Sequence, residues 1–457
     1  MEVQLVQQSA EGCDPNEFAG RQKELELIAG KLQSARHPGP DHRLLVEFFG
    51  MVGIGKSSLL RYLATLWNAR SEPATRSALI NFAQFNQPGQ WPDLLTGLAD
   101  QLGISPPGEQ GASALVSQLG GLSEVLLLLF DTSEKSSELL ELLEDQLVFP
   151  LLRTGRVVFV FAGRRWLRWK RFEVRRRVDA IELGPFNQEH TSEQLEKLGI
   201  DKTLAGPVYP YSFGHPGATR VIIDAFQRNG LPVTVDALNE HQDIIHKAVY
   251  RQFIQGRLFK GWQQDLRLFL ELTCIPRRFD VTPLKAFAGR FYPDKGYDAQ
   301  PGGYYLDMIR DMQDTTLVQW SSDWGGYILL PVLRWIMAKN LSMRDPDRFK
   351  AWHKEAAAQY EEWINLYPRN AVGFLIEWAF HRAWVCRAQG QTDQEIGEMV
   401  AQEMRTRWEE IKNKPEAQWD LPEMTEMLKS RVQDKEIATF FPELYQKMTD
   451  WGAQLEL

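Results

Sequence analysis

The first part of the chain alternates short apolar runs with segments whose apolar residues recur at helical spacing. The apolar runs have the length of strands and predict strands at 44–49, 78–83, 124–130, 156–162 and 179–183. Strands that alternate with helices are joined by helical crossovers and pair in parallel. We therefore predict an α/β domain with a parallel sheet over residues 18–185, preceded by a tail of residues 1–17.

The pattern changes to mostly helical spacing after residue 185. Segments at 187–198, 216–228 and 236–257 predict a helical lid domain over residues 186–260. Next, helical segments precede the runs TTLVQW and YILL, which the Gly-containing turn SSDWGG separates; this order is typical of a winged-helix domain, here over residues 261–341. Residues 342–457 show helical spacing throughout and predict an all-α C-terminal domain.

A glycine-rich stretch follows the first predicted strand. Residues 50–57 read GMVGIGKS and match G-x-x-x-x-G-K-[ST] at every fixed position. Glycines permit backbone torsions that turn amide hydrogens inward around a phosphate chain. Lys56 is expected to meet the β- and γ-phosphates and Ser57 to hold Mg²⁺, at the start of a helix whose positive end faces the anion. A turn without ligand is the alternative, but the strand before it and the amphipathic helix after it favour nucleotide contacts from Gly50, Gly53, Ile54, Gly55, Lys56, Ser57 and Ser58.

Two acidic residues follow the apolar run of the third predicted strand, in FDTSE. Asp131 ends a strand that is apolar enough to be buried on both faces, so it is expected at the sheet edge where α/β proteins bind ligands. We predict that Asp131 coordinates Mg²⁺ and that Glu134 polarises the attacking water. The alternative for Asp131 is a cap on the next helix.

Basic residues follow the fourth predicted strand. Arg164 ends RVVFVFAGR, where its forked donors suit the γ-phosphate; a solvated charge is the alternative. Further on, residues 163–177 mix Arg and Lys with Trp166, Trp169 and Phe172. Such a mixture can bind single-stranded nucleic acid, but we favour one helix with a packed apolar face and a charged outer face.

Together these segments resemble the STAND class of AAA-like P-loop ATPases, the signalling ATPases that include NACHT and NB-ARC proteins. FAGRQKEL, residues 18–25, is similar to the F-x-G-R-x-x-E-L segment of the family, which implies that Phe18, Gly20 and Arg21 lie over the adenine. DTSE, AGR and ELGPF are similar to the family's metal-binding strand, sensor strand and sheet end. GHP at 214–216 is similar to its G-x-P signature, which implies that Pro216 touches the nucleotide.

One family feature is missing. Many members carry a Met-His-Asp triplet in the winged helix, whose His contacts ADP, but Leu330 and Pro331 stand where that His and Asp would fall. A latch through that His is therefore not expected. The short flanking segments leave no room for an effector domain, so the resemblance implies a separately encoded effector or sensor partner.

Composition limits the remaining classes. The net charge of −8 argues against a surface built for nucleic acid. Three distant cysteines, no signal peptide and no apolar run of membrane length predict a cytoplasmic protein without a membrane segment.

The combined interpretation is an ATP/ADP-dependent signalling switch with Mg²⁺ and a slow ATPase activity that controls homo-oligomerisation or an effector, in prokaryotic defence by resemblance. One alternative is a winged-helix transcription regulator. Its candidate recognition helix, YYLDMIRDMQD at 304–314, holds three Asp and one Arg, so we do not expect it to bind DNA. The other alternative is an AAA-type remodelling ATPase, which would need an arginine finger and a strong catalytic acid.

Overall fold

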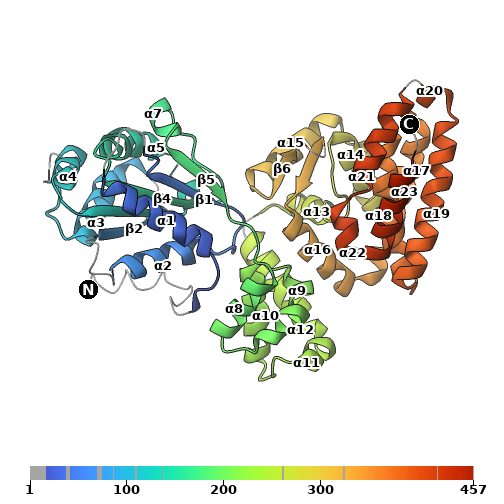
Figure 1. Cartoon of the computed structure of the whole chain (residues 1–457), viewed down its shortest axis with the longest axis horizontal. Coiled ribbons are helices and arrows are strands. Elements are labelled where there is room, and N and C mark those ends of the chain that lie inside the picture. The colour runs from blue at the N-terminus through green and yellow to red at the C-terminus, as the bar shows by residue number, and fades with distance from the viewer. Residues whose placement is uncertain are drawn as a thin grey trace. The chain divides into compact units, whose positions relative to one another are not determined.

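The computed structural model describes residues 17–37, 42–68, 75–85, 87–108, 111–136, 138–259, 262–322, 325–418 and 420–455. Residues 1–16 of the predicted tail therefore lie outside the described residues. The chain divides into two compact units, Met1–Phe253 and Ile254–Leu457, and each is described by itself (Figure 1). The four-domain division at 185, 260 and 341 stays a prediction.

The first unit is built around a five-stranded parallel sheet with the strand order β2-β3-β4-β1-β5. Its strands are β1 (Leu45–Phe49), β2 (Thr75–Asn81), β3 (Val125–Asp131), β4 (Val157–Gly163) and β5 (Val178–Glu182). Every residue of β3 and β4 is buried. The predicted parallel α/β sheet is confirmed, and its two most apolar runs are the strands at its centre.

Helices cover the sheet because each crossover between parallel strands must pass over one of its faces. They are α1 (Gln22–Ala35), α2 (Lys56–Asn68), α3 (Trp91–Leu102), α4 (Gly111–Gly120), α5 (Leu140–Leu143), α6 (Phe149–Leu152) and α7 (Phe172–Arg175), with the short turns η2 (Pro88–Gln90) and η4 (Ser133–Lys135) and the π-helical segment η5 (Glu144–Val148). Their apolar faces and the sheet form one continuous core. Within it, Phe130 stacks on Phe161 with ring centroids 4.8 Å apart.

A helical group follows the sheet in the same unit (Figure 1). It contains α8 (Gln188–Lys197), η6 (Lys202–Leu204), α9 (Ala205–Ser212), α10 (Pro216–Arg228), α11 (Val235–Glu240) and α12 (Gln242–Lys247); the π-helical segment η7 (Ala248–Leu258) runs across the division between the units. Helix α10 buries Val221, Ile222 and Phe226 together with one polar residue, Thr219. The predicted segments at 187–198 and 216–228 are confirmed as helices, whereas α9 was not predicted.

The second unit begins with three helices and a hairpin, in the order predicted for the winged helix. They are α13 (Gln264–Leu272), α14 (Val281–Phe291), α15 (Gly302–Asp314), β6 (Val318–Ser321) and β7 (Gly326–Leu329), with turns η8 (Pro293–Lys295) and η9 (Tyr297–Ala299). The hairpin is antiparallel, and Phe279 adds a further bridge to Tyr327.

The rest of the second unit is helical, as predicted. Its helices are α16 (Pro331–Arg344), α17 (Pro346–Leu366), α18 (Ala371–Ala388), α19 (Asp393–Lys412), α20 (Pro415–Gln418), α21 (Leu421–Arg431), α22 (Lys435–Phe440) and α23 (Pro442–Gln454), with the turn η10 (Pro368–Asn370). Helix α16 is continuous across the predicted boundary at 341. Trp378 on α18 and Trp408 on α19 are among the largest fully buried side chains of these helices.

Candidate functional site

The strand register brings the carboxyl ends of three strands to one edge of the sheet. Phe49 pairs with Gly163 across β1 and β4, and Asp131 pairs with Ala162 across β3 and β4. The glycine-rich loop follows Phe49 and Arg164 follows Gly163, so the loop, Asp131 and Arg164 lie side by side. This is the edge where open parallel sheets bind ligands.

The loop between β1 and α2 adopts backbone conformations that favour glycine. Gly50, Gly53 and Gly55 have φ values of +144°, +80° and +102°. A Cβ on Gly55 would meet no atom within 4 Å, whereas one on Gly53 would meet the His215 ring at 2.9 Å. The loop is therefore open beside Gly55 and closely packed beside Gly53. Ser58 is half-buried in the first turn of α2.

Lys56 is folded back onto this loop. Its Nζ donates to the carbonyl oxygens of Gly50 at 2.7 Å and Met51 at 2.8 Å. Burial lowers the pKa of Lys56 to about 8, although the charges of Glu134 and Asp131 oppose this shift. An added anion at this position would favour the charged ammonium.

Ser57 and Asp131 meet at the sheet edge. Ser57 Oγ donates to Asp131 Oδ1 at 3.1 Å, and the same oxygen accepts from the Thr132 amide at 2.8 Å. Burial raises the pKa of Asp131, while its hydrogen bond to Ser57 opposes the shift. A hydroxyl beside a carboxylate is an oxygen donor set that fits Mg²⁺ with nucleotide phosphates as further ligands. Among the described residues, no cluster of three or more His, Cys, Asp or Glu could hold a metal by itself.

Glu134 is engaged by Arg164. The Arg164 amide donates to Glu134 Oε2 at 3.1 Å, and Arg164 Nε lies 3.3 Å from Glu134 Oε1. The charge of Glu134 also raises the pKa of Lys56. The four residues predicted to carry catalysis therefore lie close together: Lys56, Asp131, Glu134 and Arg164. In this conformation, Arg164 contacts both carboxylate oxygens of Glu134.

The segment before α1 is fastened to the loop. Buried Arg21 donates through Nη2 to Ile54 O and to Gly184 O, both at 2.8 Å, and its guanidinium lies 4.9 Å from the Phe186 ring centroid. Gly20 N donates to Glu193 of α8 at 3.0 Å. Phe18 stacks on Tyr62 of α2 at 4.1 Å. Arg21 thus ties the glycine-rich loop to the end of β5.

The first turn of α10 rests directly on the loop. His215 Nδ1 accepts from Ala218 N and caps α10, so its proton is on Nε2, which donates to Val52 O at 3.0 Å. Gly217 N donates to Gly53 O at 3.0 Å. Burial lowers the pKa of His215 to about 3, which keeps the ring neutral. Pro216 is buried between these two residues, and its carbonyl accepts from Gln194.

The fold is defined by the strand order, the glycine-rich loop, Lys56 and the Ser57–Asp131 pair. The chain has a P-loop ATPase fold. No family model matches the chain, and no curated protein matches it.

Several solved structures are similar in fold to this chain. A Drosophila ORC structure bound to DNA is 16% identical, with 75% of this chain and 92% of that chain covered and a TM-score of 0.36. An ORC1 protein from Aeropyrum pernix in complex with DNA is 14% identical, with 72% and 93% covered and a TM-score of 0.38. A RuvB variant from Thermotoga maritima is 16% identical, with 68% and 92% covered and a TM-score of 0.36. Similarities this weak add no weight to the geometry of the site.

Two contacts of the glycine-rich loop were missed by the sequence reasoning, which selected only Pro216 from the segment GHP. The residues that touch the loop are its neighbours, His215 and Gly217. A signal was present: a polar residue followed by Pro at the start of an amphipathic helix predicts an N-cap, and Gly at the next position permits close approach.

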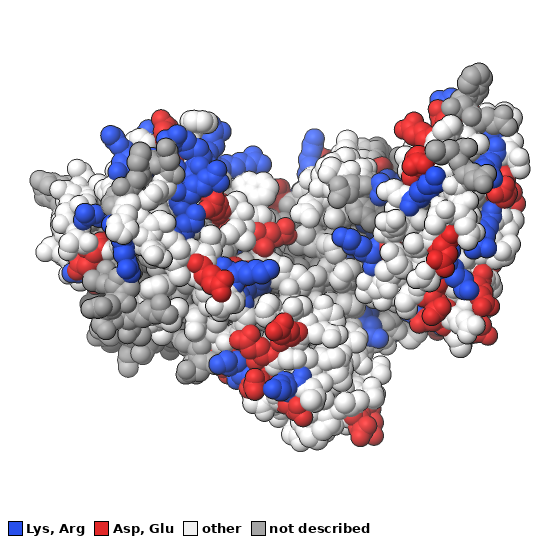
Figure 2. Space-filling model, in the orientation of Figure 1, with Lys and Arg blue, Asp and Glu red and all other residues white. Residues whose placement is uncertain are grey.

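The basic segment after β4 differs from its prediction. Only Phe172–Arg175 is helical, so the single amphipathic helix over 163–177 was wrong. Trp169 is buried and donates to the buried carboxylate of Glu47, which also accepts from Leu167 N at 2.9 Å. These contacts hold the segment extended, and leave Trp166 56% and Phe172 67% exposed. Figure 2 shows Lys and Arg side chains gathered over the region of α7.

No described helix combines the length and the apolar character needed to cross a bilayer.

Proposed function

We propose that this chain is a STAND-type signalling switch that binds ATP or ADP with Mg²⁺ and hydrolyses ATP slowly. The observation that carries the proposal is the contact between α10 and the phosphate loop. Val52 O and Gly53 O accept hydrogen bonds from the lid residues His215 and Gly217. Any rearrangement of the loop around phosphates would therefore move or break these hydrogen bonds to the lid helix.

Different residues at the loop and the sheet edge would bind the phosphates and the metal ion. The amides of the glycine loop and Lys56 would hold the phosphates, and Ser57 with Asp131 would hold Mg²⁺, which neutralises phosphate charge when bound. To reach a phosphate, Lys56 must exchange its hydrogen bonds to Gly50 O and Met51 O for new ones. By resemblance, Phe18, Gly20 and Arg21 would lie over the adenine, and Arg21 also holds the loop through its hydrogen bond to Ile54 O.

Slow hydrolysis is supported by the position of Glu134. A general base must accept a proton from water, but Arg164 contacts both carboxylate oxygens of Glu134 in this conformation. The pair must separate before Glu134 can polarise the attacking water, and Arg164 would then be free to contact the γ-phosphate. Hydrolysis would thus be gated by this rearrangement, as a timer requires.

The consequence for partners is that lid movement would expose a surface for homo-oligomerisation or for a separately encoded effector. By resemblance, the role is signalling in prokaryotic defence. Binding of DNA through α15 is not proposed, because Asp307 and Asp311 are exposed on it and Arg310 pairs with Asp307 at 3.2 Å.

Hydrogen exchange of residues 216–228 tests the switch in the full chain with ADP and with a slowly hydrolysed ATP analogue. We expect strong protection of the first turn of α10 with ADP, and faster exchange together with a larger mass in light scattering with the analogue. Lys56→Ala is the control and should respond to neither nucleotide. Equal exchange and equal mass in both states of the wild type would overturn the switch, whereas an unchanged response in Lys56→Ala would overturn the nucleotide site itself.

A further inference from the structure

The basic segment after β4, residues 163–177, enters the proposed switch only through Arg164. The segment contains eight Lys and Arg residues and one acid, Glu173, although the chain as a whole has a net charge of −8. Figure 2 shows Lys and Arg side chains gathered over the region of α7, with few Asp or Glu side chains among them. A local concentration of one charge attracts partners of the opposite charge.

Two buried carboxylates fix the backbone of this segment in an extended conformation. Glu47 of β1 accepts from Leu167 N at 2.9 Å. Glu144 accepts from the amides of Lys170 at 2.8 Å and Arg171 at 2.7 Å. Glu47 is 2% exposed and Glu144 is 1% exposed. Because the backbone is already ordered, a partner that binds here has little ordering entropy to overcome.

The side chains of the extended stretch alternate between the protein and the solvent, as they do along a strand. Leu167 is half-buried and Trp169 is buried. Trp166, Arg168 and Lys170, at the positions between and beside them, are exposed. The exposed row therefore places charged groups next to an aromatic ring.

Two aromatic residues of the segment are exposed, Trp166 by 56% and Phe172 by 67%. The ring of Trp166 is nevertheless held in place, because it packs edge-to-face with Phe49, with centroids 5.2 Å apart and ring planes at 86°. Large apolar side chains that are exposed together on a polar surface are typical of interaction sites. A ring that is both exposed and fixed can stack on another flat group.

Positive charge on this surface comes from arginines without an acidic partner. Lys170 pairs with Glu141 at 2.7 Å and Arg171 with Asp145 at 2.6 Å, so these two charges are balanced. Three other guanidinium groups are exposed and form no ion pair or hydrogen bond with any residue that the structure describes: those of Arg165, Arg168 and Arg175. Glu173, the one acid of the segment, can offset only one of these three charges.

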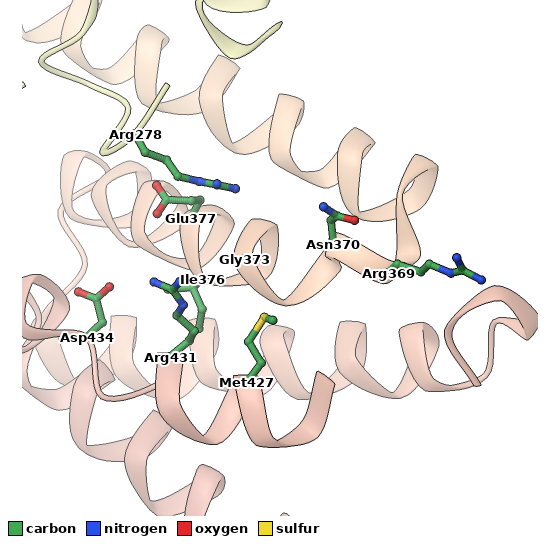
Figure 3. A pocket seen from close by; sticks show the side chains of 9 residues that line it. All are labelled: Arg278, Arg369, Asn370, Gly373, Ile376, Glu377, Met427, Arg431 and Asp434. Carbon is green, nitrogen blue, oxygen red and sulfur yellow. The ribbon is translucent and has the colours of Figure 1, made fainter. Parts of the chain in front are cut away.

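The cavity in the second unit shows no such predominance of one charge. It has a volume of about 210 Å³, and Figure 3 shows Arg278 and Arg431 in the same lining as the carboxylates of Glu377 and Asp434. This mixed lining indicates no class of ligand.

We propose that the segment binds single-stranded nucleic acid through an aromatic–basic surface formed by Arg165, Trp166, Arg168, Phe172 and Arg175. The three arginines contact phosphates, and the two rings stack on bases. The proposal does not depend on the nucleotide switch, because none of these five residues has a part in it.

Other anionic partners fit the aromatic–basic surface less well. A duplex hides the faces of its bases, because they already stack on one another. An acidic peptide would meet the charges and leave both rings exposed. A bilayer would accept a continuous apolar tip, but Arg168 and Lys170 stand between the two aromatic residues in the sequence.

The test is fluorescence anisotropy of a labelled oligothymidylate of about 12 nucleotides, a length within the usual range of site sizes. The protein is the full chain carrying Lys56→Ala, so that the phosphate loop contributes no binding. We expect saturable binding that weakens about 20-fold between about 50 and 200 mM salt, because three phosphate contacts to a single strand give a logarithmic slope of about −2.

Variants separate the two kinds of contact. Trp166→Ala should weaken binding by about 5- to 100-fold and leave the salt slope unchanged, because it removes one stacked base. The double variant Arg165→Gln, Arg168→Gln should reduce the slope by about 1.4, because it removes two phosphate contacts.

Trp320→Ala is the matched control, since Trp320 is also 56% exposed, on β6 of the second unit, and should leave binding unchanged. Thermal unfolding reports whether each variant folds, and Phe172→Ala tests stacking if Trp166→Ala does not fold. Absence of saturable binding overturns the proposal, as does an affinity that neither aromatic variant lowers. Binding of a duplex, of polyglutamate or of anionic lipid vesicles as tightly as oligothymidylate would assign the surface to that partner instead.

Discussion

The substitution Gly217→Ala offers a test, because the structure predicts a loss of stability and helix propensity predicts a gain. Gly217 is the second residue of α10, and replacing a helical Gly by Ala normally stabilises a protein by about 0.5–1 kcal/mol. Here a Cβ would lie 2.9 Å from Gly53 O and 3.2 Å from Gly53 Cα, which are backbone atoms of the phosphate loop. The loop or the helix must therefore move.

The magnitude follows from what that movement breaks. The hydrogen bond from Gly217 N to Gly53 O contributes about 0.5–1.5 kcal/mol, and overpacking of a close contact costs about 1–3 kcal/mol. After subtraction of the helix gain, Gly217→Ala should destabilise the packing of α10 on the loop by about 0.5–4 kcal/mol. Hydrogen exchange of residues 216–228 measures this as a lower free energy of local opening.

Gly30→Ala is the matched control. Gly30 lies inside α1, and a Cβ there would meet no atom within 4 Å, so only the helix gain of about 0.5–1 kcal/mol should appear. A loss of local stability for Gly217→Ala together with a gain for Gly30→Ala would confirm that α10 packs on the loop. Stabilisation by both variants would refute the contact and, with it, the coupling between nucleotide and lid.

Three further predictions concern chemistry and pH. Glu134→Gln should keep nucleotide affinity and lower ATP turnover by about 10²-fold or more, whereas the exposed neighbour Glu138→Gln should change neither; a turnover equal to wild type would return Glu134 to a structural role. Because the pKa of Lys56 is about 8 and bound phosphates would raise it, nucleotide binding should take up a proton above pH 8. Affinity should then fall by up to about tenfold per pH unit above 8 and stay flat below it; calorimetry at pH 9 in buffers of different ionisation enthalpy should show this uptake, and its absence would place Lys56 away from the phosphates. In the second unit, burial lowers the pKa of His353 to about 3 and that of His381 well below its usual value, and their Nδ1 atoms are 2.9 Å apart. The unfolded chain binds protons at these rings below about pH 6.5, so His353 should lower the free energy of unfolding by about 2 kcal/mol between pH 7 and pH 5, and His381 should add a loss of the same sign; urea titrations at both pH values should show a weaker dependence for His381→Phe.

The sheet and the loop could be predicted because their sequences allow few alternatives. The runs of β3 and β4 are apolar throughout, which only a strand between two helical layers permits. The order of strand, glycine loop, Lys56 and helix is equally specific, and so is an acid at the end of the next buried strand. Their mutual positions then follow from parallel pairing alone.

Other elements could not be predicted because long-range contacts decide them. Helix α9 contains Pro210 in its interior, where proline normally breaks a helix, but burial of Val208 and Tyr211 holds it in place. In the basic segment, the helical spacing of aromatic residues is overridden by Glu47, a buried acid inside β1 whose partners are Trp169 and Leu167 N. Neither partner is near Glu47 in the sequence.

The contact between α10 and the loop is also long-range, and the chemistry of His215 indicates what can break it. His215 is neutral, with Nδ1 bound to Ala218 N and Nε2–H bound to Val52 O. Protonation would break the cap on α10, but with the pKa of His215 at about 3, no physiological change of pH can do so. The remaining way to break the contact is to move the carbonyl groups of Val52 and Gly53, and these belong to the loop that would close around phosphates. Under the proposed switch, His215 would therefore respond to what the loop holds and not to the acidity of its surroundings.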